Sequence, residues 1–142
     1  MDAVTGTFKV KYTHLAERPF QFIRSVIAPG SPVWQPYLAT PGFPDFPSNH
    51  ATFSNSVAYV LSGIYGNQTA FANATYEGVM VDVGNGPQNL GTRHYASFDA
   101  MAEEISISRL YGGIHYRYSC EEGAKQGRKT AQNVEAQVKF LK

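Results

Sequence analysis

A proline-rich segment at residues 29–47 is the feature that most limits how this chain can fold. It holds most of the eight prolines in the 142-residue sequence. Proline fixes φ and lacks the amide hydrogen that helices and central strands need, so we predict an extended, semi-rigid loop here. Regular structure must therefore form on either side of this segment.

Helical patterns flank the loop. We expect a first helix over residues 8–28, kinked at Pro19 because proline disturbs a helix interior. A second helix is predicted to begin near Ser48 and to end at residue 63 or 66. His50 lies on the face where its apolar residues recur at helical spacing. That predicted buried face consists of Phe53, Val57, Leu61 and Ile64.

Two more helices are predicted in the second half of the chain. The third opens with Ser97 as N-cap and is broken by Gly112-Gly113. Its predicted buried stripe is Phe98, Met101, Ala102 and Ile105. The fourth opens with a capping box from Ser119 to Glu122. Its predicted packing positions are Gly127, Ala131, Val134, Val138 and Leu141.

The segment between the second and third helices shows a different pattern. Val79, Val81 and Val83 alternate with other residues and precede Gly84-Asn85-Gly86, which predicts a short strand and a turn. The chain as a whole is predicted to be a single all-α domain over residues 1–142. We expect a bundle of about four main helices joined by long loops.

Composition excludes several classes of function. A net charge of +1 argues against a broad surface for nucleic acid or acidic membranes, so any anion affinity must be local. No stretch reaches the ~18 apolar residues of a membrane span, and the first residues carry no signal-peptide pattern. The lone Cys120 cannot form an internal disulfide, and the compartment is left unassigned.

Three basic residues are candidates for binding an anion. Lys11 and Arg18 are seven positions apart, which would place both on one face of a continuous helix, about 10 Å apart along its axis. Such a pair is most often solvated surface. Arg109 extends the buried stripe of the third helix. A guanidinium on a core face needs an anion or a carboxylate partner, and the sequence leaves both open.

Three further candidates lie where the backbone itself favours anion binding. Ser48, Asn49 and His50 open a helix, where free N–H groups and a partial positive charge gather. Ser48 as an ordinary N-cap and His50 as a core histidine are the alternatives. His115 follows two glycines, which let a backbone approach a ligand closely. A break at these glycines would turn His115 and Arg109 toward one point.

Read in order, these segments resemble the signature of the vanadium haloperoxidase and type 2 phosphatidic-acid phosphatase superfamily. The superfamily pattern is Lys, six residues, Arg-Pro; then Pro-Ser-Gly-His; then Ser-Arg, five residues, His, three residues, Asp. The chain carries the first motif from Lys11 to Pro19, the second over residues 47–50 and the third from Ser108 to His115. The likeness to bacterial vanadium-haloperoxidase-like proteins extends over residues 8–138.

The resemblance implies that a tetrahedral oxyanion, vanadate or phosphate, binds at these motifs. Lys11, Arg18 and Arg109 would bind its equatorial oxygens and neutralise its charge. The planar guanidinium groups of the two arginines suit this role, because each can donate two parallel hydrogen bonds to an oxyanion. Ser48 and the backbone N–H of Asn49 would add hydrogen bonds. Vanadate is the implied cofactor, and phosphate would be able to occupy the same place.

The two histidines receive the chemical roles. His115 is implied to be the axial ligand of vanadium or, in a phosphatase, the nucleophile that becomes phosphorylated. His50 is implied to be the acid and base, because an imidazole titrates near neutral pH. The implied partners are hydrogen peroxide and a halide, or a phosphate ester. We therefore expect a haloperoxidase that oxidises bromide, iodide or chloride, with a soluble acid phosphatase as the alternative.

Two positions depart from the family pattern. Asn49 replaces the glycine of the second motif, where its side chain would either crowd the oxyanion or hydrogen-bond to it. Ser119 replaces the terminal Asp that orients the nucleophilic histidine in the phosphatases, which counts against a phosphohistidine route. These departures leave a non-catalytic oxyanion-binding relative as a third interpretation.

Length is the remaining departure, since soluble members of the family are usually much longer. We expect the chain to correspond to the carboxyl-terminal half that bears the site. A fragment, a shortened relative, and a domain completed by a second copy in a homo-oligomer all fit this expectation.

Overall fold

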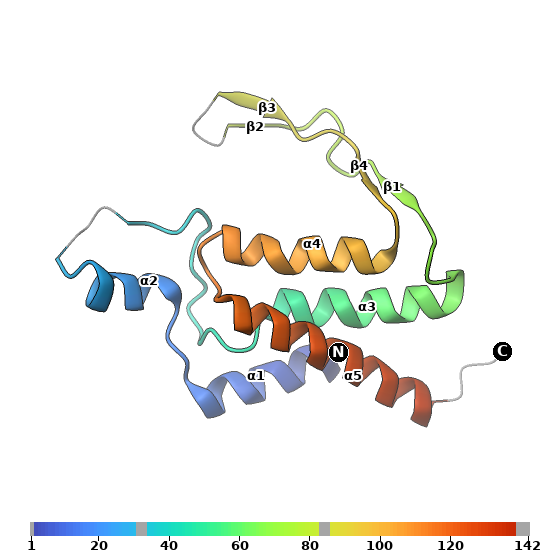
Figure 1. The fold of residues 1–142 in the computed structure, drawn as a ribbon, viewed down its shortest axis with the longest axis horizontal. Coiled ribbons are helices and arrows are strands. Elements are labelled where there is room, and N and C mark those ends of the chain that lie inside the picture. The colour runs from blue at the N-terminus through green and yellow to red at the C-terminus, as the bar shows by residue number, and fades with distance from the viewer. Residues whose placement is uncertain (1, 31–33, 83–85, 139–142) are drawn as a thin grey trace.

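The computed structural model describes residues 2–30, 34–82 and 86–138. Helices dominate it, and α3 (Asn49–Tyr65) lies at the centre of the packing. It contacts α4 (Phe98–Tyr111) on one side and α5 (Arg117–Gln137) on another, while α1 (Asp2–His14) contacts both α3 and α5 (Figure 1). The predicted all-α bundle is confirmed.

The predicted first helix is wrong in its extent and continuity. α1 ends at His14, and Leu15 follows with a left-handed φ of 50°. A separate short helix, α2 (Pro19–Phe22), leads into the π-helical turn η1 (Ile23–Ile27). The reason is that proline suits the first position of a helix, where its missing N–H is not needed. Pro19 thus starts a new helix and does not kink an existing one.

The second helix is confirmed, but its predicted buried face is wrong. Ser48 caps α3 by accepting a hydrogen bond from the N–H of Ala51. Phe53 and Ile64, which were predicted to be buried, are 55% and 66% exposed. The buried residues of α3 are mostly small: Ala51, Thr52, Ser54, Asn55, Ala58 and Ser62.

Two glycines of α5 explain why the buried residues of α3 are small. A Cβ at Gly127 would lie 2.1 Å from the carbonyl oxygen of Thr52, and one at Gly123 would lie 2.6 Å from that of Ser48. The two helix backbones therefore approach too closely for large side chains to fit between them. Helical periodicity identified the apolar face of α3, whereas close packing uses its small-residue face.

The last two helices differ from prediction mainly in detail. Ser97 caps α4 as predicted, yet Ala102 is the one member of the predicted stripe that is fully buried. α5 begins at Arg117, after Tyr116, so the capping box predicted at Ser119 is wrong. Ser119 is instead fully buried in the first turn of α5. Leu141 lies outside the described residues.

Four short strands form an arm between α3 and α4. β1 (Phe71–Asn73) pairs antiparallel with β4 (Arg93–Tyr95), and β2 (Met80–Asp82) with β3 (Pro87–Asn89) (Figure 1). The predicted short strand is confirmed in β2, whereas Val83, Gly84 and Asn85 of the predicted strand and turn lie outside the described residues. Within the part of the chain that is described, no helix is long and apolar enough to cross a bilayer.

Candidate active site

The proline-rich loop presents backbone carbonyls to a buried lysine. Lys11, in the last turn of α1, has no exposed surface. Its Nζ donates to the carbonyl oxygens of Pro44, Asp45 and Pro47 at 3.0, 2.9 and 2.6 Å. An ammonium group has three hydrogens, so these carbonyls engage all of them. Burial, aided by the charge of Arg18, lowers the pKa of Lys11 to about 8.

Arg18 reaches the same loop from the segment that joins α1 and α2. It stands immediately before α2 and is 2% exposed. Its Nε donates to the carbonyl of Phe43 at 3.0 Å, and its Nη1 donates to that of Ile114 at 2.7 Å. The prediction that Lys11 and Arg18 share one helix face is wrong. The two cations converge because both bind the loop, on either side of the break after α1.

His115 is brought to this point by the turn between α4 and α5. Its ring is almost fully buried, and Nε2 lies 3.1 Å from Nη1 of Arg18. Arginine is a donor only, so Nε2 accepts this hydrogen bond. Burial lowers the pKa of His115, and the charges of Arg18 and Lys11 act in the same direction, whereas Asp45 opposes them. The first and third sequence motifs thus meet at a hydrogen bond between Arg18 and His115.

The two glycines before His115 act differently from the prediction. A Cβ at Gly112 would lie 2.6 Å from Cδ1 of Leu38, and one at Gly113 would lie 3.1 Å from Cα of Pro36. The glycines therefore make room for the proline-rich loop. They allow a close approach between two parts of the chain, where we had expected a ligand.

Asp45 is a member of the site that the sequence motifs did not identify. It is fully buried, and its Oδ1 lies 2.7 Å from Nδ1 of His115 and 3.8 Å from Nη1 of Arg18. A signal for it existed, since Asp45 is the one acidic residue between positions 29 and 50. A carboxylate in an otherwise uncharged loop needs a partner when the loop packs inward.

The start of α3 lies beside the same cluster. Ser48 is fully buried, and its N–H donates to the carbonyl of Ser119 at 2.9 Å. Asn49 is partly buried, and its Oδ1 is buried with no hydrogen-bond partner among the described residues. His50 is exposed, and partial burial of its ring together with the charge of Arg109 lowers its pKa. The interpretation of His50 as a core histidine is therefore wrong.

Arg109 differs from Lys11 and Arg18 in its hydrogen bonding. Within the described part of the chain, its Nε is buried and lacks an acceptor. Its charge lowers the pKa of both Arg18 and His50, so the three side chains lie near one another. The alternative of a structural salt bridge to Arg109 finds no support among the described residues.

The electrostatics of the site favour an anion. We call Lys11, Arg18 and Arg109 the cation cluster. Asp45 supplies one negative charge, which acts on Lys11 and Arg18, and Arg109 adds a third positive charge near Arg18, so the four groups carry a formal excess of two positive charges. Burial penalises unpaired charge, and the orphaned Nε of Arg109 lacks the acceptor that a buried donor normally has. An oxyanion would supply both the charge and the acceptors.

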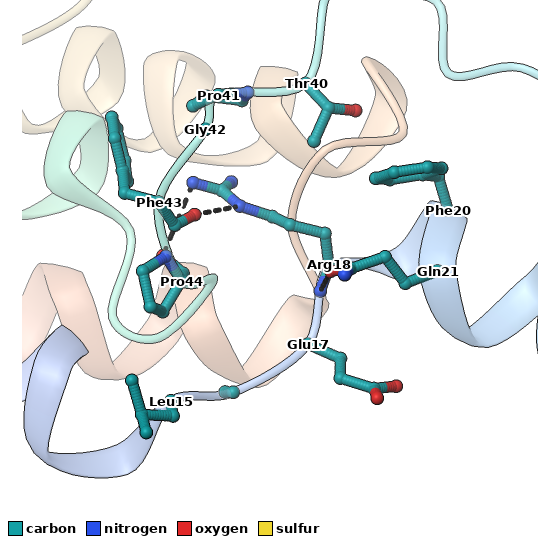
Figure 2. Close-up of a pocket in the computed structure, with 11 residues that line it drawn as sticks. Leu15, Glu17, Arg18, Phe20, Gln21, Thr40, Pro41, Gly42, Phe43 and Pro44 are labelled. Atoms are coloured by element: carbon teal, nitrogen blue, oxygen red, sulfur yellow. Dashed lines mark hydrogen bonds between the residues drawn. The ribbon is translucent and has the colours of Figure 1, made fainter.

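A cavity opens next to Arg18 on its other side. It measures about 440 Å³ and is lined by residues of two segments, 15–21 and 40–44 (Figure 2). In Figure 2 the guanidinium of Arg18 points toward Phe43 and Pro44, while Phe20, Gln21 and Thr40 surround the space beside its stem. His50, Arg109 and His115 are not among its lining residues. The cavity thus adjoins the cluster but does not contain it.

Comparison with known families agrees with the motifs. The family described as "VCPO second helical-bundle domain" matches residues 1–141. The chain belongs to the vanadium haloperoxidase superfamily. No curated protein matches it significantly.

Solved vanadium haloperoxidases share the fold. The chain is 35% identical to a bacterial vanadium-dependent iodoperoxidase, with a TM-score of 0.81, and covers 96% of its own length but 30% of that protein. An apo-type bacterial vanadium-dependent chloroperoxidase is 16% identical, with a TM-score of 0.74 over 98% of this chain and 35% of the other. The holo-type structure gives 17% identity and a TM-score of 0.65 over 87% of this chain and 31% of the other. The chain therefore spans about a third of these vanadium haloperoxidases.

Proposed function

We propose that this chain binds vanadate and oxidises halides with hydrogen peroxide, as a vanadium-dependent haloperoxidase. The observation that carries the proposal is a buried His115 whose Nε2 accepts a hydrogen bond from Arg18 within a site of excess positive charge. Sequence identity of 35% to an iodoperoxidase supports it. Iodide and bromide are the halides to examine first.

The residues present fit an oxyanion. Among the described residues there is no group of three or more His, Cys, Asp or Glu, the usual set for a metal cation. Vanadate needs a different set, with cations and N–H donors for its oxygens and one imidazole for the metal. The orphaned Nε of Arg109, the free N–H groups at the start of α3 and Nε2 of His115 provide this set.

Each residue then has a defined task. Arg18 and Arg109 bind and neutralise the oxygens, and His115 binds the vanadium through Nε2. Ser48 and the N–H of Asn49 donate hydrogen bonds from the start of α3, while His50, exposed and near Arg109, transfers protons at the solvent side. Bound vanadate supplies a Lewis-acidic centre that activates peroxide toward a halide.

The hydrogen bonds inside the site affect how an anion enters. Lys11 already donates to the carbonyls of Pro44, Asp45 and Pro47, and Arg18 donates to His115. Arg109 has no such internal acceptor at Nε. Arg109 is therefore the cation with a donor available to an anion without a change inside the site. Binding through Nε2 of His115 would require Arg18 to give up its hydrogen bond to that nitrogen, and Lys11 would act through its charge, because its hydrogens are engaged.

A soluble acid phosphatase is the second candidate, and Asp45 favours it. The absence of the family's terminal Asp at Ser119 counted against a phosphohistidine route, because an imidazolium needs a carboxylate nearby. Oδ1 of Asp45 lies 2.7 Å from Nδ1 of His115, which supplies that carboxylate from another part of the chain. The objection is thereby removed, although sequence similarity still favours the haloperoxidase.

A direct assay distinguishes the candidates. The 142-residue chain is incubated with orthovanadate, hydrogen peroxide and iodide or bromide, and halogenation of a dye is followed. We expect turnover that depends on vanadate and is lost in His115→Ala. The matched control is His94→Ala, which removes an exposed histidine of β4.

The outcomes separate three functions. Halogenation without vanadate, or full activity in His115→Ala, would contradict the proposed site. Hydrolysis of an aryl phosphate, inhibited by vanadate, would establish the phosphatase. Thermal stabilisation by vanadate and phosphate without either activity would identify a non-catalytic binder, because a ligand stabilises the folded state that it binds.

A further inference from the structure

We propose that Asp45 is the residue that positions His115, by accepting the hydrogen of Nδ1 and so keeping Nε2 without a hydrogen, as a ligand nitrogen must be. The carboxylate comes from the proline-rich loop, 70 positions before His115 in the chain, and not from the helix after it. The statement about Nε2 as a ligand rests on the proposed function. The assignment of the tautomer does not.

Two independent contacts determine the tautomer. A neutral imidazole carries one hydrogen, so one ring nitrogen donates and the other accepts. Arg18 has only donors, and its Nη1 lies 3.1 Å from Nε2, which must therefore accept. On the other side of the ring, the carboxylate of Asp45 is an acceptor at 2.7 Å from Nδ1. Both contacts require the hydrogen to reside on Nδ1.

The Asp45 carboxylate has no competing donor. Among the described residues, no other donor forms a hydrogen bond with Oδ1 or Oδ2; the nitrogen in contact with Oδ1 is Nδ1 of His115 at 2.7 Å, and the guanidinium of Arg18 is farther away at 3.8 Å. Asp45 is fully buried, so water does not replace the missing partners at its surface. A buried carboxylate without a partner is costly, and its contact with His115 is therefore strongly favoured.

The backbone of Asp45 is held on three sides. Its N–H donates to the carbonyl of Ala16 at 2.9 Å. Its carbonyl accepts from Nζ of Lys11 at 2.9 Å and from the hydroxyl of Ser119 at 3.2 Å. The rest of the site thus fixes the position from which the carboxylate reaches the ring.

Ser119 has a supporting part in this arrangement. It occupies the position of the family's terminal Asp, and its Oγ lies 3.3 Å from Nδ1 of His115. Because its hydroxyl donates to the carbonyl of Asp45, Ser119 tethers the loop that carries the carboxylate. The carboxylate of Asp45 thus takes the place of the family's terminal Asp at Nδ1 of His115.

The consequence concerns affinity for the oxyanion. A carboxylate behind a ligating histidine fixes the orientation of the ring and raises its basicity. Removing such a partner typically weakens metal binding roughly 10- to 100-fold. We expect an effect of this size when Asp45 loses its charge.

The tautomer is tested in the anion-free wild-type chain. The ¹⁵N chemical shifts of the His115 ring, assigned by comparison with His115→Ala, identify which nitrogen carries the hydrogen. A protonated Nδ1 and an unprotonated Nε2 are expected. The opposite pattern would overturn the proposal. This measurement needs neither vanadate nor activity, so it is independent of the proposed function.

Variants test the positioning role. Vanadate binding is measured by equilibrium dialysis for the wild type, Asp45→Asn, and Asp45→Asn combined with Ser119→Asp. We expect Asp45→Asn to weaken binding about 10- to 100-fold. The double variant should regain much of it, because a carboxylate at residue 119 would lie within reach of Nδ1. Rescue of this kind is not expected if Asp45 merely supports the loop.

The control variant is Glu17→Gln, which removes an exposed carboxylate next to Arg18 and should leave affinity unchanged. Wild-type affinity in Asp45→Asn would refute the positioning role. If the wild type binds neither vanadate nor phosphate but shows the Nδ1–H tautomer, the proposed function fails and the assignment of Asp45 to the ring stands.

Discussion

Arg109 differs from the other members of the cation cluster at the scale of a single residue. Lys11 and Arg18 donate to backbone carbonyls, whereas the buried Nε of Arg109 has no acceptor within the described residues. Burial lowers the pKa of Arg109, which reflects the cost of its charge in this environment. A bound anion would remove this cost. Without a bound anion, the side chain of Arg109 therefore destabilises the folded chain.

The first prediction follows from this destabilising effect. Arg109→Met should raise the unfolding free energy of the anion-free chain by up to about 1 kcal/mol, since an unsatisfied buried donor is removed. It should also abolish stabilisation by phosphate or vanadate. Denaturant unfolding with and without each anion measures both effects. Arg93→Met is the control, because Arg93 forms an exposed ion pair with Glu104 and its loss should leave the anion effect intact. Destabilisation of the anion-free protein by Arg109→Met would contradict the argument.

At the scale of elements, the crossing of α3 and α5 holds the start of α3 in place. Gly123 and Gly127 of α5 face the backbone of α3 at Ser48 and Thr52. The N–H of Ser48 also donates to the carbonyl of Ser119 in the first turn of α5. The same close approach therefore positions both the start of α3 and Ser119, whose side chain contacts His115.

Alanine substitution of one glycine tests this crossing. Gly127→Ala would place Cβ 2.1 Å from the carbonyl oxygen of Thr52, and backbone atoms cannot move aside without separating the helices. We expect a loss of about 3 kcal/mol in unfolding free energy. Gly63→Ala in α3 is the matched control, because its Cβ would meet no atom within 4 Å. That change should stabilise the chain by about 0.5–1 kcal/mol, measured by urea denaturation. Equal effects of the two substitutions would refute the close crossing.

At the scale of the whole molecule, an apolar face is left uncovered. Phe53 and Val60 of α3 are 55% and 47% exposed, beside a groove of about 340 Å³ that α1, α3 and α5 line together. Contiguous apolar surface of this kind commonly marks an interface. A homo-oligomer was one of three interpretations of the short chain, and it stays a prediction; this face is the candidate surface for a second copy.

The homo-oligomer interpretation predicts that the chain associates with itself. Sedimentation velocity should show a species larger than the monomer whose share rises with concentration. Phe53→Glu should shift the chain to monomer, since a charge on the face opposes burial. Ile27→Glu, at an exposed position on η1, should leave association unchanged. A wild-type chain that is monomeric at all concentrations would contradict this prediction.

The sequence alone determined the class of the fold and the order of the candidate residues. Helical periodicity and a proline-rich interruption gave an all-α bundle, because both depend on local backbone preferences. Periodicity erred for α3, where it selected the apolar face that includes Phe53. Burial there depends on the glycines of α5, which lie far along the chain. No local pattern in α3 contains that information.

Tertiary structure decided which residues meet. Pro19 starts a new helix, so Lys11 and Arg18 converge through the loop and not along one helix face. Asp45 reaches His115 across 70 positions of sequence, whereas the family motif has its carboxylate four residues after the histidine, where this chain has Ser119. Motifs record which side chains a site contains, because spacing along one segment is local. The partner of a buried charge is set by packing between distant segments, and only the folded chain brings those together.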